Sequence, residues 1–250
     1  MTPSRSPAPR AILRSYWLVG SAVLIAVGSL KGAAGATTCA VALAAVWPEP
    51  PVLVEADCAG GDLGAWHWVP DSPGLVSLAA ALRTGRAEVA AHATGLACGV
   101  EAVVAAAGRQ QATVAVGLLA EADPGLWARE RPVIADVGRL EPGAPSVALV
   151  AAADVLLLCS RGDLGSLLRL AEADVPASTR VVLAGGSRYR HGEIAARIGR
   201  PVFGEVPWDV HAAQVVGGRR PAGRGWTQRG LPAAARALAG RLPPRWRDGA

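Results

Sequence analysis

The chain has 250 residues, of which 51% are hydrophobic and 18% charged, and its formal net charge is +5. This length and composition allow a sizeable buried core in one large α/β domain or two small ones. The positive charge is compatible with anionic partners but does not by itself indicate nucleic-acid binding. The cysteines are scattered without metal-ligand spacing, which excludes a disulfide framework and predicts a reducing compartment; they are Cys39, Cys58, Cys98 and Cys159.

The N-terminal region carries two patterns. Residues 1–15, rich in Pro, Ser and Arg, are predicted to form a disordered basic leader. The apolar run 16–30 that follows resembles a signal peptide, although it is too short for a comfortable membrane span. A buried parallel strand also has a continuous apolar sequence. We favour the strand, because a glycine-containing loop and a helix start at Thr37 follow at once.

Strands and helices are predicted to alternate along the remaining chain. This order indicates βαβ units and a mostly parallel sheet with helices on both faces. We therefore expect one α/β domain over residues 16–243, followed by a basic tail over residues 244–250. The predicted strands are 22–27, 51–57, 100–105, 132–136, 155–159, 181–184 and 201–206, and the predicted helices are 37–46, 74–82, 109–121, 146–152, 164–173, 192–198 and 231–242.

The loop between the first strand and the first helix is distinguished by its charge. Lys31 is the only lysine among 25 lysines and arginines, and it lies in this loop. Lysine is a compact charge on a flexible stem, whereas arginine is a planar fork, so this position indicates a small cation that reaches a ligand. Gly32 and Gly35 let backbone N–H groups approach that ligand, which in a strand–loop–helix turn is usually a phosphate. Chance in an arginine-biased composition is the alternative.

Acidic residues follow two of the predicted strands. Asp57 comes after the apolar run 52–54, and Asp136 comes after the run 133–135. In a parallel sheet the carboxyl ends of the strands meet at the edge where ligands bind. Mg²⁺ prefers a mixture of carboxylate, hydroxyl and water ligands, and Thr37 in the loop offers the hydroxyl. The sequence therefore predicts magnesium near Thr37 and Asp136.

Taken in order, these segments resemble the MinD/ParA family of deviant P-loop ATPases, over roughly residues 22 to 242. The family loop K-G-G-x-G-K-T-[TS] is similar to K-G-A-A-G-A-T-T at residues 31–38. The resemblance continues in V-E-A-D at residues 54–57, in V-I-A-D at residues 133–136 and in V-P-W-D at residues 206–209. The loop looks most like that of degenerate actinobacterial-type members, and the TadZ/CpaE-like pilus proteins also tolerate altered loops. The fold implied is the single-domain P-loop NTPase fold.

The resemblance also implies ATP and Mg²⁺ as cofactors. It implies that Lys31 reaches a nucleotide phosphate across a dimer interface, that Thr37 and Asp136 bind the metal, and that Asp57 orients the attacking water. For Asp57, a strand-end cap is the alternative. The implied nucleotide-binding residues, of which the last two border the adenine, are Lys31, Gly32, Ala33, Ala34, Gly35, Ala36, Thr37, Thr38, Pro207 and Asp209.

The loop departs from the family pattern in a way that affects catalysis. Ala36 occupies the position of the ordinary P-loop lysine, and Ala33 replaces a glycine. That lysine neutralises charge during phosphoryl transfer, and its loss is expected to remove roughly 3 kcal/mol or more of transition-state stabilisation. Hydrolysis is therefore expected to be weak or absent. Arg139 and Arg161 follow strand ends and are candidate replacement cations, with solvated surface arginines as the alternative.

The expected function is a nucleotide-binding switch that forms a homodimer and positions a partner protein complex in cell division, DNA partition or pilus and secretion assembly. One alternative is a nucleotide-independent pseudo-ATPase scaffold, which Ala36 motivates. Another is a non-specific DNA-binding protein of the ParA kind. We rank nucleic acid as the less favoured partner, because the terminal arginines are spread among Gly and Pro.

The last predicted helix bears on location. Its apolar residues fall on one side, where the default expectation is packing on the sheet and the alternative is contact with a membrane surface. We expect a cytoplasmic protein, and the membrane alternative would place it at the inner membrane face. The residues on that side are Leu231, Ala235, Leu238 and Leu242.

Overall fold

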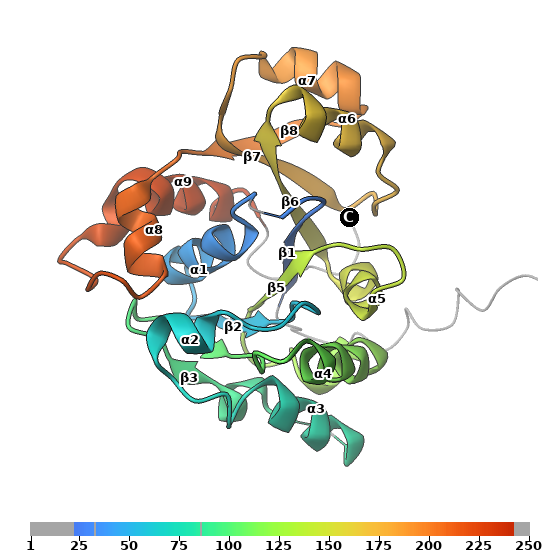
Figure 1. Ribbon diagram of the computed structural model, residues 1–250, viewed down its shortest axis with the longest axis vertical. Helices are drawn as coiled ribbons and strands as arrows, with labels where there is room; N and C mark the ends of the chain where they lie inside the picture. The colour runs from blue at the N-terminus through green and yellow to red at the C-terminus, as the bar shows by residue number, and fades with distance from the viewer. Residues whose placement is uncertain (1–22, 33, 86, 243–250) are drawn as a thin grey trace, which may run out of the picture.

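The computed structural model describes residues 23–32, 34–85 and 87–242, which fold around one sheet (Figure 1). The sheet has the strand order β3-β4-β2-β5-β1-β6-β7-β8. Its neighbouring strands are parallel, except β3 and β4, which are antiparallel. The strands are β1 (Leu24–Ser29), β2 (Val52–Glu55), β3 (Thr94–Gly95), β4 (Glu101–Val103), β5 (Val133–Arg139), β6 (Val155–Gly162), β7 (Thr179–Ser187) and β8 (Val202–Val206).

Helices connect the strands and cover the sheet. Most of them lie between two strands that run in the same direction, as βαβ units require. The α-helices of the described residues are α1 (Ala36–Val46), α2 (Leu63–His67), α3 (Leu75–Arg83), α4 (Arg109–Glu121), α5 (Pro145–Ala152), α6 (Leu164–Glu172), α7 (His191–Ile198), α8 (Val210–Val216) and α9 (Gly230–Ala239). Short 3₁₀ helices are η1 (Val89–His92), η2 (Pro124–Leu126) and η3 (Trp226–Gln228).

The sheet separates two hydrophobic cores. Along β1, Ile25 and Val27 join the core that contains α1, α8 and α9, whereas Leu24 and Ala26 join the core that contains α3 to α7. Figure 1 shows α1, α8 and α9 together on one side of the sheet, with α4 and α5 on the other. Because both faces of the sheet are covered, its central strands need apolar side chains in both directions. This explains why the described part of the apolar run near the N-terminus contains a buried strand, β1.

The alternation of strands and helices predicted from the sequence is confirmed. Each of the seven predicted strands and seven predicted helices has a counterpart, and α4 has the predicted bounds 109–121. The prediction missed α2, α8 and the two-residue strand β3. It also extended the second strand to residue 57, whereas β2 ends at Glu55. The predicted leader 1–15 and the tail 244–250 lie outside the described residues.

The C-terminal helix α9 is packed inside the domain. Its apolar residues Leu231, Ala235 and Leu238 are buried, as is Leu242 just beyond the helix. They belong to the core that α9 shares with α1. The predicted packing on the domain is thus confirmed, and the side on which a membrane contact would depend is already covered. Among the described residues, no helix combines the length and the apolar character that crossing a membrane requires.

Candidate functional site

The carboxyl ends of four central strands bring the predicted site residues together. In the sheet register, Asp136 of β5 lies beside Val27 of β1 and Glu55 of β2. Cys159 of β6 lies beside Ser29, the last residue of β1. The loop that carries Lys31 therefore leaves the sheet between the strand ends that carry the acids and the strand that carries Arg161. This is the edge at which open α/β sheets bind ligands.

The loop ends on the N-terminus of α1. Gly35 is the N-cap residue, with φ 77° and ψ 25°, a left-handed conformation that favours glycine. No side chain caps the helix, and its first turn contains no acidic residue. The first N–H groups of a helix have no intrahelical acceptor, and the helix dipole adds positive potential there. This end of α1 is therefore suited to an anion, as the sequence predicted, while Ala33 of the same loop lies outside the described residues.

Asp136 lies at the bottom of the site and is only 1% exposed. It accepts a hydrogen bond from the hydroxyl group of Thr37, and its Oδ1 accepts another from the backbone N–H of Gly138 at 3.2 Å. Burial raises the pKa of Asp136 to about 7, and the nearby carboxylates of Glu55 and Asp57 add to this increase, while the two hydrogen bonds oppose it. The two predicted metal ligands, Thr37 and Asp136, are thus in contact in the structure, and their binding of a metal stays a prediction.

Glu55 is a buried acid whose role the sequence prediction missed. Its Oε1 accepts hydrogen bonds from the backbone N–H groups of Asp62 at 2.7 Å and Leu63 at 2.9 Å. Its Oε2 accepts another from Ala105 at 2.9 Å. Burial raises the pKa of Glu55 despite these bonds. Glu55 therefore ties the loop after β2 and the start of α2 to the segment after β4, which fixes the surroundings of Asp57.

Asp57 lies in that loop, next to the end of β5. Its Oδ1 accepts a hydrogen bond from the N–H of Ala59 at 2.7 Å, the geometry of a local cap. Its Oδ2 lies so close to Gly138 that a Cβ atom there would be 1.9 Å away. Burial raises the pKa of Asp57, and the charges of Asp62 and Glu141 contribute to the increase. Asp57 therefore has the local cap, and its predicted catalytic role stays a prediction.

The acids and the hydroxyl group fit the chemistry of magnesium. The carboxylates of Glu55 and Asp57 are close enough to raise the pKa of Asp136, so an added cation is electrostatically favoured among these three acids. Within the described part of the chain, no group of three or more acidic, His or Cys side chains forms a metal site by itself. Mg²⁺ does not need one, because it usually keeps several waters and binds one or two carboxylates together with substrate phosphates.

A cavity lies at the carboxyl ends of β6 and β7. It has a volume of about 510 Å³ and is lined by the last residues of these strands, by the residues that follow them and by Trp208 after β8. Trp208 is 69% exposed, and Gly185, with φ +81°, lies against its ring. An exposed indole beside a cavity offers a flat apolar surface to a planar group. The sequence predicted a base-bordering segment at residues 206–209 but no role for Trp208 itself. The position of Trp208 beside Gly185 depends on the tertiary structure, which brings two distant segments together.

Pro207 and Asp209, which were predicted to border the base, are the sequence neighbours of this tryptophan. Asp209 nevertheless has a structural task. Its Oδ1 accepts a hydrogen bond from Ala212 at 2.9 Å, which caps α8, and its Oδ2 accepts one from Leu231 at 3.0 Å, in the first turn of α9. Asp209 therefore joins the N-termini of α8 and α9. Its predicted contact with a nucleotide stays a prediction.

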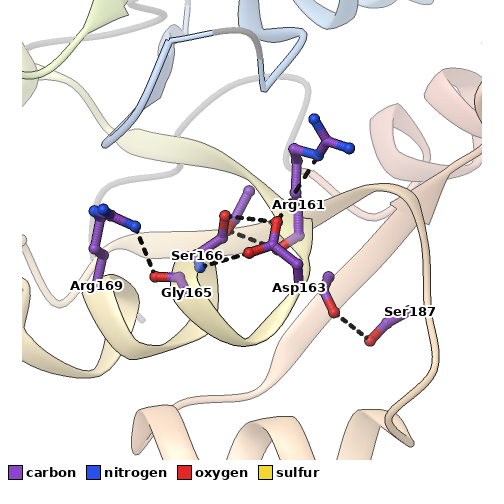
Figure 2. Close-up of polar contacts among 8 residues, drawn as sticks. Arg161, Asp163, Gly165, Ser166, Arg169 and Ser187 are labelled. Carbon is purple, nitrogen blue, oxygen red and sulfur yellow. Dashed lines mark hydrogen bonds and ion pairs between the residues drawn. The ribbon is translucent and has the colours of Figure 1, made fainter.

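The two candidate replacement arginines lie in different places. Arg139, at the end of β5, has its Nε 3.6 Å from Oε1 of Glu141, and Arg109 of α4 is 3.6 Å from the other oxygen of that carboxylate. Arg161, near the end of β6, has its Nε 3.8 Å from Oδ2 of Asp163 (Figure 2). Arg161 also lines a cavity of about 150 Å³ together with Lys31 and Gly32. Arg139 is the register partner of Ser29 just before the loop, whereas Arg161 shares a cavity with Lys31 and Gly32 of the loop itself.

Comparison by sequence finds no matching protein-family model and no matching curated protein. Comparison by structure does find matches. The ParA family ATPase from Chlorobium tepidum has a TM-score of 0.69 at 19% identity, and the alignment covers 89% of this chain and 100% of that one. The cell division ATPase MinD from Pyrococcus furiosus has a TM-score of 0.66 at 18% identity, and the alignment covers 88% of this chain and 97% of that one.

A third similar structure is the septum site-determining protein MinD from Pyrococcus horikoshii, complexed with Mg-ADP. It has a TM-score of 0.66 at 16% identity, and the alignment covers 87% of this chain and 94% of that one. Because these sequence identities are low, the structural similarity establishes the fold alone. The chain therefore has the MinD/ParA P-loop NTPase fold over nearly the whole length of the described residues.

Proposed function

We propose that this chain is a MinD/ParA-like nucleotide-binding switch, which binds Mg-ATP and Mg-ADP at the loop before α1 and whose dimeric state is read by a partner protein. The observation that carries this proposal is the arrangement at the end of β1. An uncapped helix N-terminus follows the loop that holds Lys31, and a buried carboxylate, Asp136, is hydrogen-bonded to Thr37. The complex of the Pyrococcus horikoshii MinD structure with Mg-ADP supports the choice of ligand.

Each group would act on a different part of the ligand. The N–H groups of the first turn of α1 would bind phosphate oxygens, and Lys31 would add a compact positive charge. Thr37 and Asp136 would hold Mg²⁺, which when bound neutralises phosphate charge and orients the phosphates. The pKa of Asp136 is raised to about 7, so its carboxyl would release a proton on binding the metal. Trp208 would offer a surface on which the base stacks.

Hydrolysis is proposed to be weak. Ala36 has no charge to place on the phosphates, and it is itself buried in the core that contains α1. A switch without the ordinary P-loop lysine would bind and release the nucleotide faster than it hydrolyses it. The proposed assembly is a homodimer that recruits a partner complex in cell division, DNA partition or pilus and secretion assembly, in the cytoplasm.

Calorimetric titration of the purified chain with Mg-ATP and Mg-ADP tests the proposal. We expect saturable binding, and we expect Lys31→Ala to weaken it by roughly 10- to 100-fold, the range of one charged hydrogen bond. Lys31→Arg is the matched variant, because it keeps the charge but replaces the compact ammonium by a fork. No heat at millimolar nucleotide, with the chain folded, would contradict the proposal.

A second candidate function is a pseudo-ATPase scaffold that dimerises without nucleotide, and Ala36 is the observation that favours it. Sedimentation velocity separates the two functions. The switch predicts that Mg-ATP converts monomer to dimer and that Lys31→Ala prevents the conversion. The scaffold predicts the same dimer with and without nucleotide, in the variant as in the natural chain.

A further inference from the structure

The proposed phosphate site lacks one positive charge. P-loops in general place a lysine immediately before the hydroxyl residue that binds the metal, and this chain has Ala36 there. Lys31 is the only lysine of the chain, so a second cation at the site has to be an arginine. Arg139 and Arg161 both lie at the carboxyl ends of strands that border the loop. The cavities at this edge of the sheet distinguish between them.

Arg161 belongs to the face of the sheet that carries α1. Along β6, Leu157 and Cys159 pack into the core that contains α1, whereas Leu156 and Leu158 pack into the opposite core. Successive side chains of a strand point to opposite faces, so Arg161 follows the direction of Leu157 and Cys159. The pairing of β6 with β7 continues without a register shift as far as Arg161. Arg161 therefore emerges on the side from which the loop enters α1.

Arg139 lies at the end of β5, where the strand is irregular. The pairing of β5 with β1 has a register shift at Val137, so the alternation of buried side chains does not extend to Arg139. Its partner Glu141 also contacts Arg109, the first residue of α4. Arg139 is not among the residues that line the cavity beside Lys31 or the cavity beside Trp208, so it is the less favoured of the two candidates.

The cavities place Arg161 between the two halves of the proposed nucleotide site. It lines the cavity of about 150 Å³ whose other residues include Lys31 and Gly32. It also lines the cavity of about 510 Å³ that contains Gly185 and Trp208. A ligand whose phosphates lie on the loop and whose planar base lies against Trp208 therefore extends past the guanidinium group of Arg161.

Arg161 pairs with Asp163 near the site, and this pair leaves the guanidinium group able to bind a ligand. Asp163 is fixed as the N-cap of α6, because Oδ1 accepts a hydrogen bond from the N–H of Ser166 and Oδ2 one from its hydroxyl group, both at 3.0 Å. Figure 2 shows Asp163 between Ser166 and Arg161, with the guanidinium directed away from α6. The pair between Arg161 and Asp163 is long and exposed, so it contributes little and exchanges readily for a phosphate.

We propose that Arg161 binds the phosphates of the nucleotide and supplies from β6 the positive charge that Ala36 cannot supply from α1. This inference rests on the proposed nucleotide site and adds the residue that completes it. A guanidinium carries five N–H donors in a plane, and this fork matches the oxygens of a phosphate. Asp163 pairs with this fork only weakly, which leaves the fork free to bind a phosphate.

Arg161→Ala is the direct test, and Arg139→Ala is its matched control. The two arginines are each 58% exposed in their side chains, and their carboxylate partners lie at 3.8 Å and 3.6 Å. The readout is the affinity for Mg-ADP, measured by titration of a fluorescent analogue at fixed ionic strength, with thermal unfolding as the check of folding. We expect Arg161→Ala to weaken binding about 10- to 100-fold and Arg139→Ala to change it less than about threefold.

Two further variants test the charge itself. In the Arg161→Ala background, Ala36→Lys restores a cation from the helix, and we expect it to recover most of the lost affinity. Arg161→Lys keeps the charge in place, and we expect it to retain more affinity than Arg161→Ala even if the double variant does not fold. Recovery by either variant identifies the missing charge, not a general change of structure, as the cause.

The outcomes separate this inference from the proposed function. If the natural chain binds no nucleotide, the proposed function fails, and this inference fails with it. If the natural chain binds and Arg161→Ala binds equally well, the nucleotide site stands and the role of Arg161 is refuted. Equal losses of Mg-ADP affinity in Arg161→Ala and Arg139→Ala would also overturn the inference. They would indicate that the overall positive field of the protein, and not a contact of Arg161, attracts the nucleotide.

Discussion

The buried carboxyl group of Asp136 provides a prediction that needs no ligand. Its ordinary pKa of 3.8 is raised to about 7, chiefly by burial. Between these two values the folded chain keeps a proton on Asp136 that the unfolded chain has lost. Stability therefore decreases as pH rises from about 4 to about 7, because the native state binds more protons than the unfolded state in that window. The full cost of ionising the buried group is on the order of 4 kcal/mol.

Asp136→Asn removes this cost while it keeps the shape of the side chain. The asparagine oxygen at the position of Oδ1 still accepts the hydrogen bond from the Gly138 N–H, and the side chain stays neutral at every pH. We expect the variant to be more stable than the natural chain by up to about 4 kcal/mol at pH 8.5 and by roughly 2 kcal/mol at pH 5. The gain should decrease further toward pH 4, where the unfolded carboxyl also becomes protonated.

Urea unfolding at pH 4, 5 and 8.5, without Mg²⁺ or nucleotide, measures this difference. Asp71→Asn is the matched control, because it removes a carboxylate from an exposed loop and should change stability little at any of these pH values. A stability difference for Asp136→Asn that does not change with pH would refute the reasoning, as would a variant less stable than the natural chain at pH 8.5. Nucleotide binding by Asp136→Asn should no longer depend on Mg²⁺, although this variant is more stable to unfolding than the natural chain.

Other residues give further predictions. Gly138→Ala should destabilise the domain by about 2 kcal/mol or more in urea unfolding, because φ is +59° and the new Cβ would overlap Asp57. Asp209→Ala should cost about 1 to 3 kcal/mol in the same assay, since it uncaps α8 and frees α9. The pKa of buried His67 is lowered, mainly by burial, so acidification below about pH 6.5 should destabilise the natural chain relative to His67→Gln; parallel pH profiles would contradict this.

The fold was predictable because its signals are long and regular. The apolar runs that became β1, β5 and β6 are buried on both faces, and a continuous run is what such strands require. The missed elements are short. Helices α2 and α8 have five and seven residues, too few for an amphipathic period, and β3 has two. The two helices begin where Glu55 and Asp209 accept backbone N–H groups at their first turns.

The candidate site was predictable in part. A lone lysine in a glycine-containing loop and an aspartate after an apolar strand indicated Lys31 and Asp136, because strand ends of a parallel sheet meet at one edge. The sequence offered Arg139 and Arg161 as equals, since each follows a strand. Their difference depends on the cavities that each side chain lines, and segments distant in the sequence form these cavities. The place of Trp208 beside Gly185 needed the tertiary structure.

The central claim is that the loop before α1 binds a nucleotide, and hydrogen–deuterium exchange with and without saturating Mg-ADP tests it at that place. We predict slower exchange of the backbone amides in peptides that cover residues 30–38, and in peptides that cover residues 206–209, with little change at the opposite edge of the sheet. Unchanged exchange of the loop and of the first turn of α1 at millimolar Mg-ADP, in a folded chain, would contradict the account.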